Sequence, residues 1–221
     1  MIPLVHDFDG EVVLVFGGGT VGARKARRFA REARVVVVSP VFADADFGAS
    51  EFVRAAPDPD DVPSWLDAAD PALVVAATDD ATLNAAIESA ATARGTLVNR
   101  ADRSGERGRR SVVVPATVDA GAVRVSVTTS GTSPAVSRHL SRELASVVDG
   151  AGRVATVVGE LRAELKARGV DPGRRRDAVR AVAASEAVWS VAREGDDESA
   201  VRDAAERVLS TALDDDADGR V

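Results

Sequence analysis

The chain has 221 residues, 45% of them hydrophobic and 29% charged, which is ordinary for a globular protein of one large or two small domains. Cysteine is absent and the two histidines lie far apart in the sequence, which excludes disulfides, thiolate chemistry and a metal-binding motif. The formal net charge of −7 argues against nucleic acid as a partner.

The distribution of apolar and charged residues indicates a cytoplasmic protein. No apolar run approaches the roughly 18 residues that a membrane-spanning helix needs, and the first ten residues do not have the pattern of a signal peptide. Arginine outnumbers lysine 26 to 2, and aspartate outnumbers glutamate 23 to 12. Such a composition is typical of a halophile, although GC-rich coding would also replace lysine by arginine, so both interpretations stay open.

The first hundred residues alternate strand-like and helix-like segments. Helices are expected over 20–32 and 80–94, and the stretch PDPDDVPSWLD is expected to be a connection. Short, mostly apolar runs predict strands at 11–16, 34–38, 51–54, 72–77 and 96–99. Strands that alternate with helices at this spacing predict an α/β fold, a doubly wound parallel sheet of the Rossmann type.

The pattern changes after a polar loop over 102–110. Two β-branched runs, 111–115 and 122–129, predict an antiparallel pair of strands. Ser133 and Pro134 are typical of an N-cap and a first helical residue. From there the sequence is helical, with later helices expected over 151–168, 172–194 and 198–213.

A glycine-rich motif, Gly17-Gly18-Gly19-Thr20-Val21-Gly22, follows the first strand and opens the first helix. It fits G-x-G-x-x-G, in which the glycines allow a tight turn, close approach to a pyrophosphate and close packing of helix on strand. The alternative is an ordinary glycine-rich turn, but the position of the motif favours a dinucleotide. Pro40 and Val41, after the second strand, and Thr78, after the fourth, are expected to complete the cofactor site.

An acidic residue usually ends the second strand of an NAD site, where it holds the ribose hydroxyls. Here the corresponding residues are Ser39, Pro40 and Val41. Without the acid, nothing repels the 2′-phosphate of NADP, so the residues leave the choice between NAD and NADP open.

Five segments occur in the order and spacing of a known family: GGGTVGARKA, VVVVSP, LVVAATDDATLN, LVNRAD and VVVPATVDAGAVRVSVTTSGTSPAVSRHLSREL. The chain resembles the N-terminal module of siroheme synthases, a family of precorrin-2 dehydrogenases of which some members are also sirohydrochlorin ferrochelatases. The resemblance runs from about Leu4 to Val148 and continues loosely beyond. The methyltransferase half that is fused to some bacterial relatives is not expected, since the sequence ends at residue 221.

The resemblance implies NAD-dependent oxidation of precorrin-2 to sirohydrochlorin, a step of siroheme biosynthesis. It also implies a homodimer of chains with three parts: a Rossmann domain (1–110), a dimerisation region (111–150) and a helical domain (151–221). An isolated antiparallel pair of strands is marginal in water, which agrees with a dimer. Insertion of Fe²⁺, a lyase activity, stays open: no metal site of the protein is expected, but the tetrapyrrole supplies four nitrogens of its own.

The family's catalytic aspartate lies in an N-V-V-D segment, which matches Asn99-Arg100-Ala101-Asp102. Hydride loss from a reduced tetrapyrrole must be accompanied by proton loss, so a carboxylate near the ring suits the chemistry. Because an aspartate with a pKa of about 3.9 is a weak base, we expect burial against the macrocycle to raise the pKa of Asp102. Without the resemblance, Asp102 would be interpreted as a residue that caps a turn. The usual hydrophobic pair before the aspartate is replaced by Arg100 and Ala101.

Candidate substrate contacts follow the aspartate. The loop after Asp102 is longer than usual in the family, and it is either a charged surface loop or a recognition site for the carboxylates of the substrate. Its arginines are Arg103, Arg107, Arg109 and Arg110. The other residues expected to contact substrate are Asn99, Thr129, Ser130 and Arg138.

Two other functions remain possible on the sequence alone. A regulatory Rossmann module that senses NAD(H) without chemistry would explain the glycine motif but would give no role to Asp102. A metal chelatase without redox activity would need Asp102 but no intact glycine motif.

Overall fold

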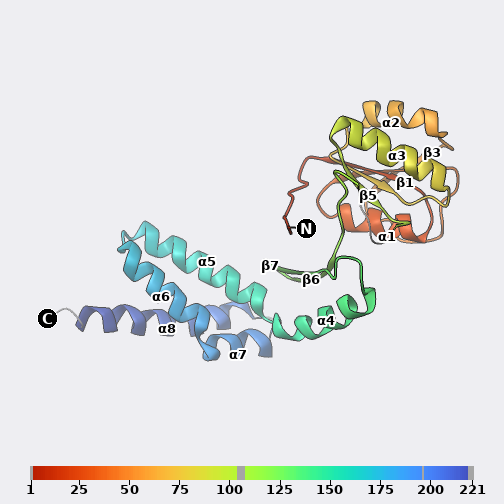
Figure 1. Cartoon of the computed structure of the whole chain (residues 1–221). Helices are drawn as coiled ribbons and strands as arrows, with labels where there is room; N and C mark the ends of the chain where they lie inside the picture. The colour runs from red at the N-terminus through yellow and green to blue at the C-terminus, as the bar shows by residue number, and fades with distance from the viewer. Residues whose placement is uncertain (1, 104–107, 196, 219–221) are drawn as a thin grey trace. The chain divides into compact units, whose positions relative to one another are not determined.

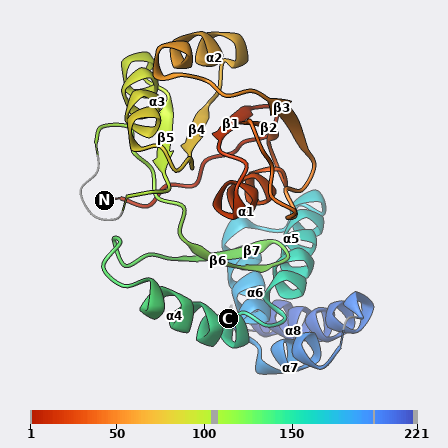
Figure 2. The same cartoon turned by 90° about the vertical axis from the view of Figure 1, so that its right-hand side faces the viewer.

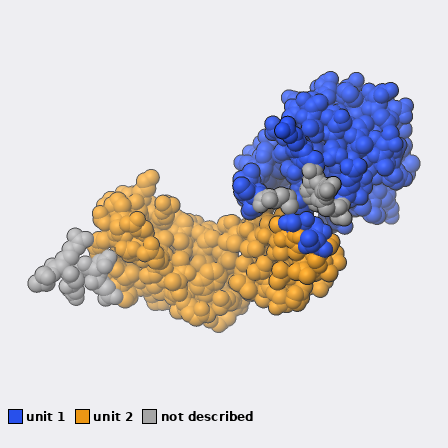
Figure 3. All heavy atoms as spheres, in the orientation of Figure 1, with its two compact units in different colours: residues 1–114, 130–132 blue, residues 115–129, 133–221 orange. Residues whose placement is uncertain are grey.

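The computed structural model describes residues 2–103, 108–195 and 197–218. The chain divides into two compact units, which Figure 3 shows in two colours. Unit 1 comprises residues 1–114 and 130–132, and unit 2 comprises residues 115–129 and 133–221. Each unit has its own hydrophobic core. Among the described residues, no helix is both long enough and apolar enough to cross a membrane.

Unit 1 contains a five-stranded parallel sheet with the strand order β3-β2-β1-β4-β5, which confirms the Rossmann-type fold class. Its strands are β1 (Val12–Phe16), β2 (Arg34–Ser39), β3 (Ser50–Arg54), β4 (Leu73–Ala76) and β5 (Leu97–Arg100). Its helices are α1 (Thr20–Phe29), α2 (Val62–Ala69) and α3 (Ala81–Arg94), with the 3₁₀ turn η1 (Pro59–Asp61) before α2.

Successive residues of a strand point to opposite faces of the sheet. Because the inner strands β1 and β4 are apolar at successive positions, both faces are apolar, and helices cover each of them. Figures 1 and 2 show α1 on one face and α2 with α3 on the other. Val13 and Val15 of β1 belong to the core on the α1 face, and Leu14 and Phe16 belong to the core under α2 and α3. All four side chains are fully buried, which explains why the strand is an unbroken apolar run.

The helix α2 corrects the expectation that PDPDDVPSWLD is only a connection. Prolines are tolerated in the first turn of a helix, where the missing N–H has no helical partner, and Pro63 lies at that position. Val62 and Leu66 are buried one turn apart under the sheet. Burial of this apolar face accounts for the helix.

The predicted strand at 111–115 is wrong. The two-stranded sheet is formed by β6 (Ala116–Ala120) and β7 (Val123–Val127), because Gly121, with φ of 62°, makes a tight turn that pairs Ala120 with Val123. The preceding segment lies beside β5 instead, where the Val112 N–H donates to the Val98 carbonyl at 2.8 Å. It therefore belongs to unit 1.

Unit 2 contains this hairpin and five helices: α4 (Pro134–Val147), α5 (Ala151–Ala167), α6 (Pro172–Ala184), α7 (Glu186–Glu194) and α8 (Glu198–Asp218). The single helix predicted over 172–194 is wrong, since the extended backbone of Ser185 (ψ 113°) separates α6 from α7. The last helix runs to Asp218, beyond the predicted end at 213. The predicted Ser133 cap and first-turn Pro134 are confirmed, with the Val136 N–H donating to the Ser133 hydroxyl.

Candidate active site at the carboxyl edge of the sheet

Four loops leave the parallel sheet at one edge, because parallel strands all end on the same side. The glycine motif follows β1, Pro40 and Val41 follow β2, Thr78 follows β4, and Asp102 follows β5. The strand order reverses between β1 and β4, and at such a switch point open α/β sheets bind their ligands. The structure thus brings together the predicted cofactor residues and the predicted catalytic aspartate.

Three glycines of the motif are required by the fold itself. A Cβ at Gly17 would collide with the Ala77 carbonyl, and one at Gly22 would collide with the Gly17 carbonyl. A Cβ at Gly18 would collide with the Val41 carbonyl. These positions allow the turn and the close packing of α1 on the sheet.

Gly19 differs, because nothing in the protein requires a glycine there. A Cβ at this position would have no heavy atom within 4 Å, and the backbone (φ −78°, ψ −178°) is one that any residue adopts. Gly19 is the N-cap of α1, whose first turn carries no acidic residue. An open glycine before helical N–H groups fits the close approach of an anion such as a pyrophosphate.

The loop after β2 carries no carboxylate at its start. The Ser39 hydroxyl donates to the Val41 carbonyl at 2.7 Å, and this bond shapes the turn. Arg54, at the end of β3, donates from Nη1 to the Pro40 carbonyl at 2.9 Å and lies over the Phe42 ring. The charged side chain that is hydrogen-bonded to the loop after β2 is therefore that of Arg54, a cation.

Thr78 is held by a buried amide that the sequence reasoning did not assign to the site. The Thr78 hydroxyl donates to Asn84 Oδ1 at 2.8 Å, and Asn84 Nδ2 donates to the Thr78 carbonyl at 2.9 Å. Asn84 lies in α3 and is 1% exposed. A signal was present: an asparagine on the buried face of a helix rich in alanine indicates a specific hydrogen-bonding role.

Asp102 is clamped by Arg100. Arg100 donates from Nε to Asp102 Oδ1 at 2.8 Å and from Nη2 to Oδ2 at 2.6 Å, while its Nη1 donates to Glu88 Oε2 at 2.9 Å. The Arg100 side chain is 3% exposed and that of Asp102 27%. The hydrogen bonds from Arg100 outweigh desolvation and lower the pKa of Asp102. In the protein alone the pKa of Asp102 therefore lies below its ordinary value, and the expected rise on burial against the macrocycle stays a prediction.

Asn99 is also buried, at 3% exposure, in β5. Its Nδ2 donates to the Val112 carbonyl at 2.7 Å, and its Oδ1 has no partner among the described residues. The amide fastens segment 111–114 to the sheet.

Of the predicted arginines of the long loop, Arg109 and Arg110 lie away from Asp102, whereas Arg103 approaches Glu88 at 3.5 Å. The Arg110 carbonyl accepts a hydrogen bond from the Val98 N–H, and its guanidinium lies beside Gly95, the C-cap of α3 at the start of β5. The Arg109 carbonyl accepts from Thr92 at 3.5 Å. Both therefore lie at the amino end of β5, the opposite end from Asp102. Arg107 lies outside the described residues.

The remaining predicted substrate residues lie around the start of α4. The Thr129 hydroxyl donates to the Ser133 carbonyl at 3.1 Å and lies 3.2 Å from the Ser137 hydroxyl, so it orders the loop. Ser130 follows with a positive φ of 55°. Arg138 is exposed on α4.

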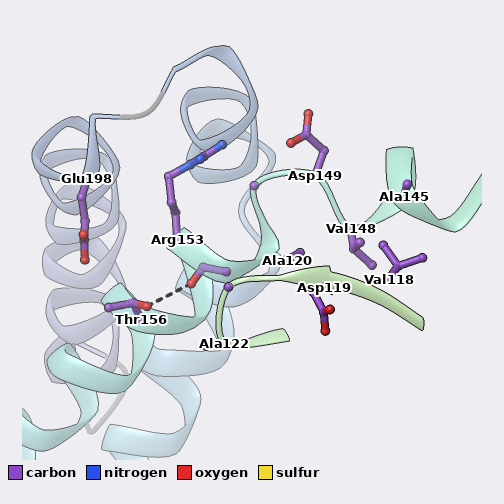
Figure 4. Close-up of a pocket in the computed structure, with 13 residues that line it drawn as sticks. Val118, Asp119, Ala120, Ala122, Ala145, Val148, Asp149, Arg153, Thr156 and Glu198 are labelled. Carbon is purple, nitrogen blue, oxygen red and sulfur yellow. Dashed lines mark hydrogen bonds between the residues drawn. The ribbon is translucent and has the colours of Figure 1, made fainter. Parts of the chain in front are cut away.

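Unit 2 contains a hollow of about 410 Å³ between the hairpin turn and α5 (Figure 4). Its carboxylates, Asp119, Asp149 and Glu198, point in different directions and do not converge on one point (Figure 4). Its cation, Arg153, donates to the Ala192 carbonyl at the end of α7. No group of three or more metal-binding side chains occurs among the described residues. The hollow thus lacks the convergent polar groups of an active site.

Comparison with known proteins decides the family. Residues 4–116, which include the glycine motif and Asp102, match a family described as "Putative NAD(P)-binding". The precorrin-2 dehydrogenase of Methanosarcina barkeri is 31% identical over 201 residues, which cover 86% of this chain and 85% of that relative. This chain belongs to the precorrin-2 dehydrogenase family.

Other relatives agree with this membership. Siroheme synthases of Aeromonas salmonicida and Pseudomonas paraeruginosa are 33% and 34% identical, and the chain spans 37% and 35% of their respective lengths. The solved structure of "SirC, precorrin-2 dehydrogenase" superposes with a TM-score of 0.69 at 21% identity, covering 95% of this chain and all of that one, and so shares the fold.

Proposed function

We propose that this chain oxidises precorrin-2 to sirohydrochlorin with NAD as the hydride acceptor, as a step of siroheme biosynthesis. The observation that carries the proposal is one sheet edge that holds both an open glycine at a helix N-terminus and a fixed carboxylate. This edge belongs to a chain that aligns over most of its length with a named precorrin-2 dehydrogenase.

The residues at this edge of the sheet would have two roles, cofactor binding and proton transfer. The backbone N–H groups around Gly18 and Gly19 would hold the pyrophosphate, and Pro40, Val41 and Thr78 would line the rest of the cofactor site. Bound NAD supplies an acceptor for the hydride that leaves the tetrapyrrole. Oxidation also releases one proton, and Asp102 is the carboxylate placed to accept it. Arg100 occupies one lone pair on each oxygen of Asp102, so the proton would go to a remaining lone pair.

Several finer properties belong to the same proposal. A homodimer would cover the hairpin and α4, since β6 and β7 form a sheet of only two strands and none of the residues of α4 is buried within the chain. The parts at 1–110, 111–150 and 151–221 would then act as cofactor, dimerisation and helical domains. Thr129, Ser130 and Arg138 would contact the substrate. Insertion of Fe²⁺ would use the nitrogens of the tetrapyrrole, and the acidic surface would suit a salty cytoplasm.

The test is anaerobic incubation of the full chain with precorrin-2 and either NAD or NADP, in high salt, following the absorbance of sirohydrochlorin. We expect turnover with NAD; the missing acid after β2 predicts that NADP is not rejected outright. A folded protein that binds NAD but turns over neither mixture would instead be a sensing module. Adding Fe²⁺ to a productive mixture then tests insertion.

A further inference from the structure

Arg100 is a charged residue in a strand whose side chains are mostly buried. It ends β5, and its side chain is 3% exposed. A buried guanidinium is costly unless each of its donors is paired, and breaking such a pairing leaves an uncompensated charge. Its Nε, Nη1 and Nη2 all bond to carboxylates. The fold thus accommodates a cation here only together with its two acidic partners.

The two acids come from different elements. Asp102 follows β5, two residues beyond Arg100, whereas Glu88 lies in α3 with its side chain 19% exposed. The bidentate pair to Asp102 has the parallel geometry that fixes both the position and the plane of a carboxylate. The third bond, to Glu88, ties the guanidinium to the helix. As a result, Asp102 is anchored through Arg100 to α3.

We propose that Arg100 is a positioning residue for the dehydrogenation, which holds Asp102 as a fixed, ionised carboxylate at the cofactor edge of the sheet. The inference rests on the proposed function, since it assigns Arg100 a role through Asp102. Arg100 itself ends β5 and lies outside the glycine motif.

Within the described part of the chain, two further charged side chains lie near Arg100 and Asp102. Glu88 faces Arg100 from α3, and Arg103, 58% exposed, approaches Glu88 at 3.5 Å from the other side. The Asn84 amide, also on α3, further lowers the pKa of Asp102. Among the described side chains of this cluster, two are cations and two are carboxylates, and Arg100 is the cation bonded directly to Asp102. Ionisation of Asp102 should therefore depend on Arg100 more than on any other of these residues.

This role predicts a specific dependence on pH. With Arg100 in place, Asp102 stays ionised to a lower pH than an ordinary aspartate, so the acidic fall of kcat/KM lies low. Lysine keeps the charge but is a single point donor and cannot bond both oxygens in a fork. In Arg100→Lys we therefore expect the acidic fall to move to higher pH, with a loss of kcat and little change in the Kd for NAD.

The experiment measures the pH dependence of kcat/KM for the wild type, Arg100→Lys and Glu88→Gln, together with the titration of the Asp102 carboxyl carbon by ¹³C NMR. Asp102→Asn assigns the resonance. Arg94→Met is the matched control, because Arg94 also bonds an aspartate, Asp67, from Nε and Nη2 but lies at the far end of α3. We expect upward shifts of both midpoints in Arg100→Lys, a smaller shift in Glu88→Gln, and none in Arg94→Met.

The outcomes separate the inference from the proposed function. If the wild type oxidises precorrin-2 but the acidic midpoint is the same in Arg100→Lys, Arg100 is only structural and the inference is overturned. If the wild type does not oxidise precorrin-2, the proposed function fails, and the NMR titration still shows whether Arg100 controls Asp102. Should both variants fail to fold, an Asp102 midpoint in the wild type at or above that of an ordinary aspartate overturns the inference by itself.

Discussion

Each unit of the chain contains an arginine that binds carboxylates from two elements, and the two centres differ in burial. In unit 1, Arg100 is 3% exposed and joins Asp102 to Glu88. In unit 2, Arg202 is 32% exposed and joins Glu206 of α8 to Glu160 and Glu164 of α5. The second is a surface network on two packed helices, whereas the first lies at the same edge of the sheet as the glycine motif, with β4 between β1 and β5. The same pairing chemistry thus serves helix packing in one unit and a chemical site in the other.

The largest expected difference between the two centres is in catalysis. Asp102→Asn removes the proton acceptor and should lower kcat about 10²- to 10⁴-fold, with NAD binding unchanged. Glu160→Gln is the matched control, because it removes a carboxylate from Arg202 in the same way. Stopped-flow turnover and NAD titration measure both variants. Full activity of Asp102→Asn would take Asp102 out of the mechanism.

An open glycine in each unit sharpens the comparison further. Gly19→Asp places a carboxylate against the proposed pyrophosphate site and should weaken NAD binding more than about 100-fold, equivalent to about 2.7 kcal/mol. Neither Gly19 nor Gly159, in α5, has an atom within 4 Å of its missing Cβ. Gly159→Asp therefore serves as the control, and calorimetric titration with NAD compares them.

Both glycine variants should remain folded, since neither side chain meets a neighbour. Gly22→Ala should instead be destabilised, because its Cβ would collide with the Gly17 carbonyl, and overpacking of this kind costs about 1–3 kcal/mol or more. Equal NAD affinity in the wild type and Gly19→Asp would show that the cofactor lies elsewhere.

Replacement of Arg100 and of Arg202 should have very different effects on the free energy of unfolding. Arg100→Met removes the ion pair of Asp102 and leaves Glu88 with only its longer contact to Arg103, so it should lower the free energy of unfolding by about 3–5 kcal/mol. Arg202→Met removes exposed ion pairs, and its unfolding midpoint should hardly move. Urea denaturation followed by circular dichroism measures both.

The dependence on pH of the stability loss in Arg100→Met tests whether that loss has an ionic origin. The pKa of Asp102 is lowered in the folded chain, so the pair stabilises the fold above the unfolded pKa of about 3.9, and this contribution is lost as pH falls through the folded value. The stability gap between wild type and Arg100→Met should therefore narrow in acid. A gap that is constant with pH would contradict an ionic origin.

The smallest expected effect concerns the helix caps. Asp80 accepts from the N–H groups of Thr82 and Leu83 at the start of α3, whereas Ser133 accepts only from that of Val136 at the start of α4. Asp80→Ala and Ser133→Ala should each lower stability by about 1 kcal/mol, with the larger loss for Asp80. Thermal unfolding measures the difference, and an equal loss would show that the second bond contributes nothing.

Elements with a local cause were predictable from the sequence, and elements that depend on tertiary contacts were not. The strand β1 was predictable because burial on both faces demands an unbroken apolar run. The hairpin register was not, since the β-branched run at 111–115 is as strand-like as any other segment before Gly121, and only the turn decides that 116–120 pairs with β7. α2 was obscured by its prolines, and the break at Ser185 has no strong local signal.

The site divides in the same way. The glycine motif is local, so the sequence alone located it. The partner of Arg100 on α3 lies 12 residues away, at Glu88, and the clamp becomes visible only when β5 and α3 are packed together. The position of Arg110 also depends on tertiary contacts. Arg110 is close to Asp102 in sequence, but the segment around Ser111 runs parallel to β5, and Arg110 therefore lies at the other end of the strand.

The most direct test of the central claim is a crystal structure of the full chain with NAD. We predict the pyrophosphate against the backbone N–H groups of Gly18 and Gly19, and the nicotinamide on the side of the edge where Asp102 remains bonded to Arg100. A dinucleotide bound anywhere else, such as the hollow of unit 2, would contradict the account, as would a nicotinamide that points away from Asp102.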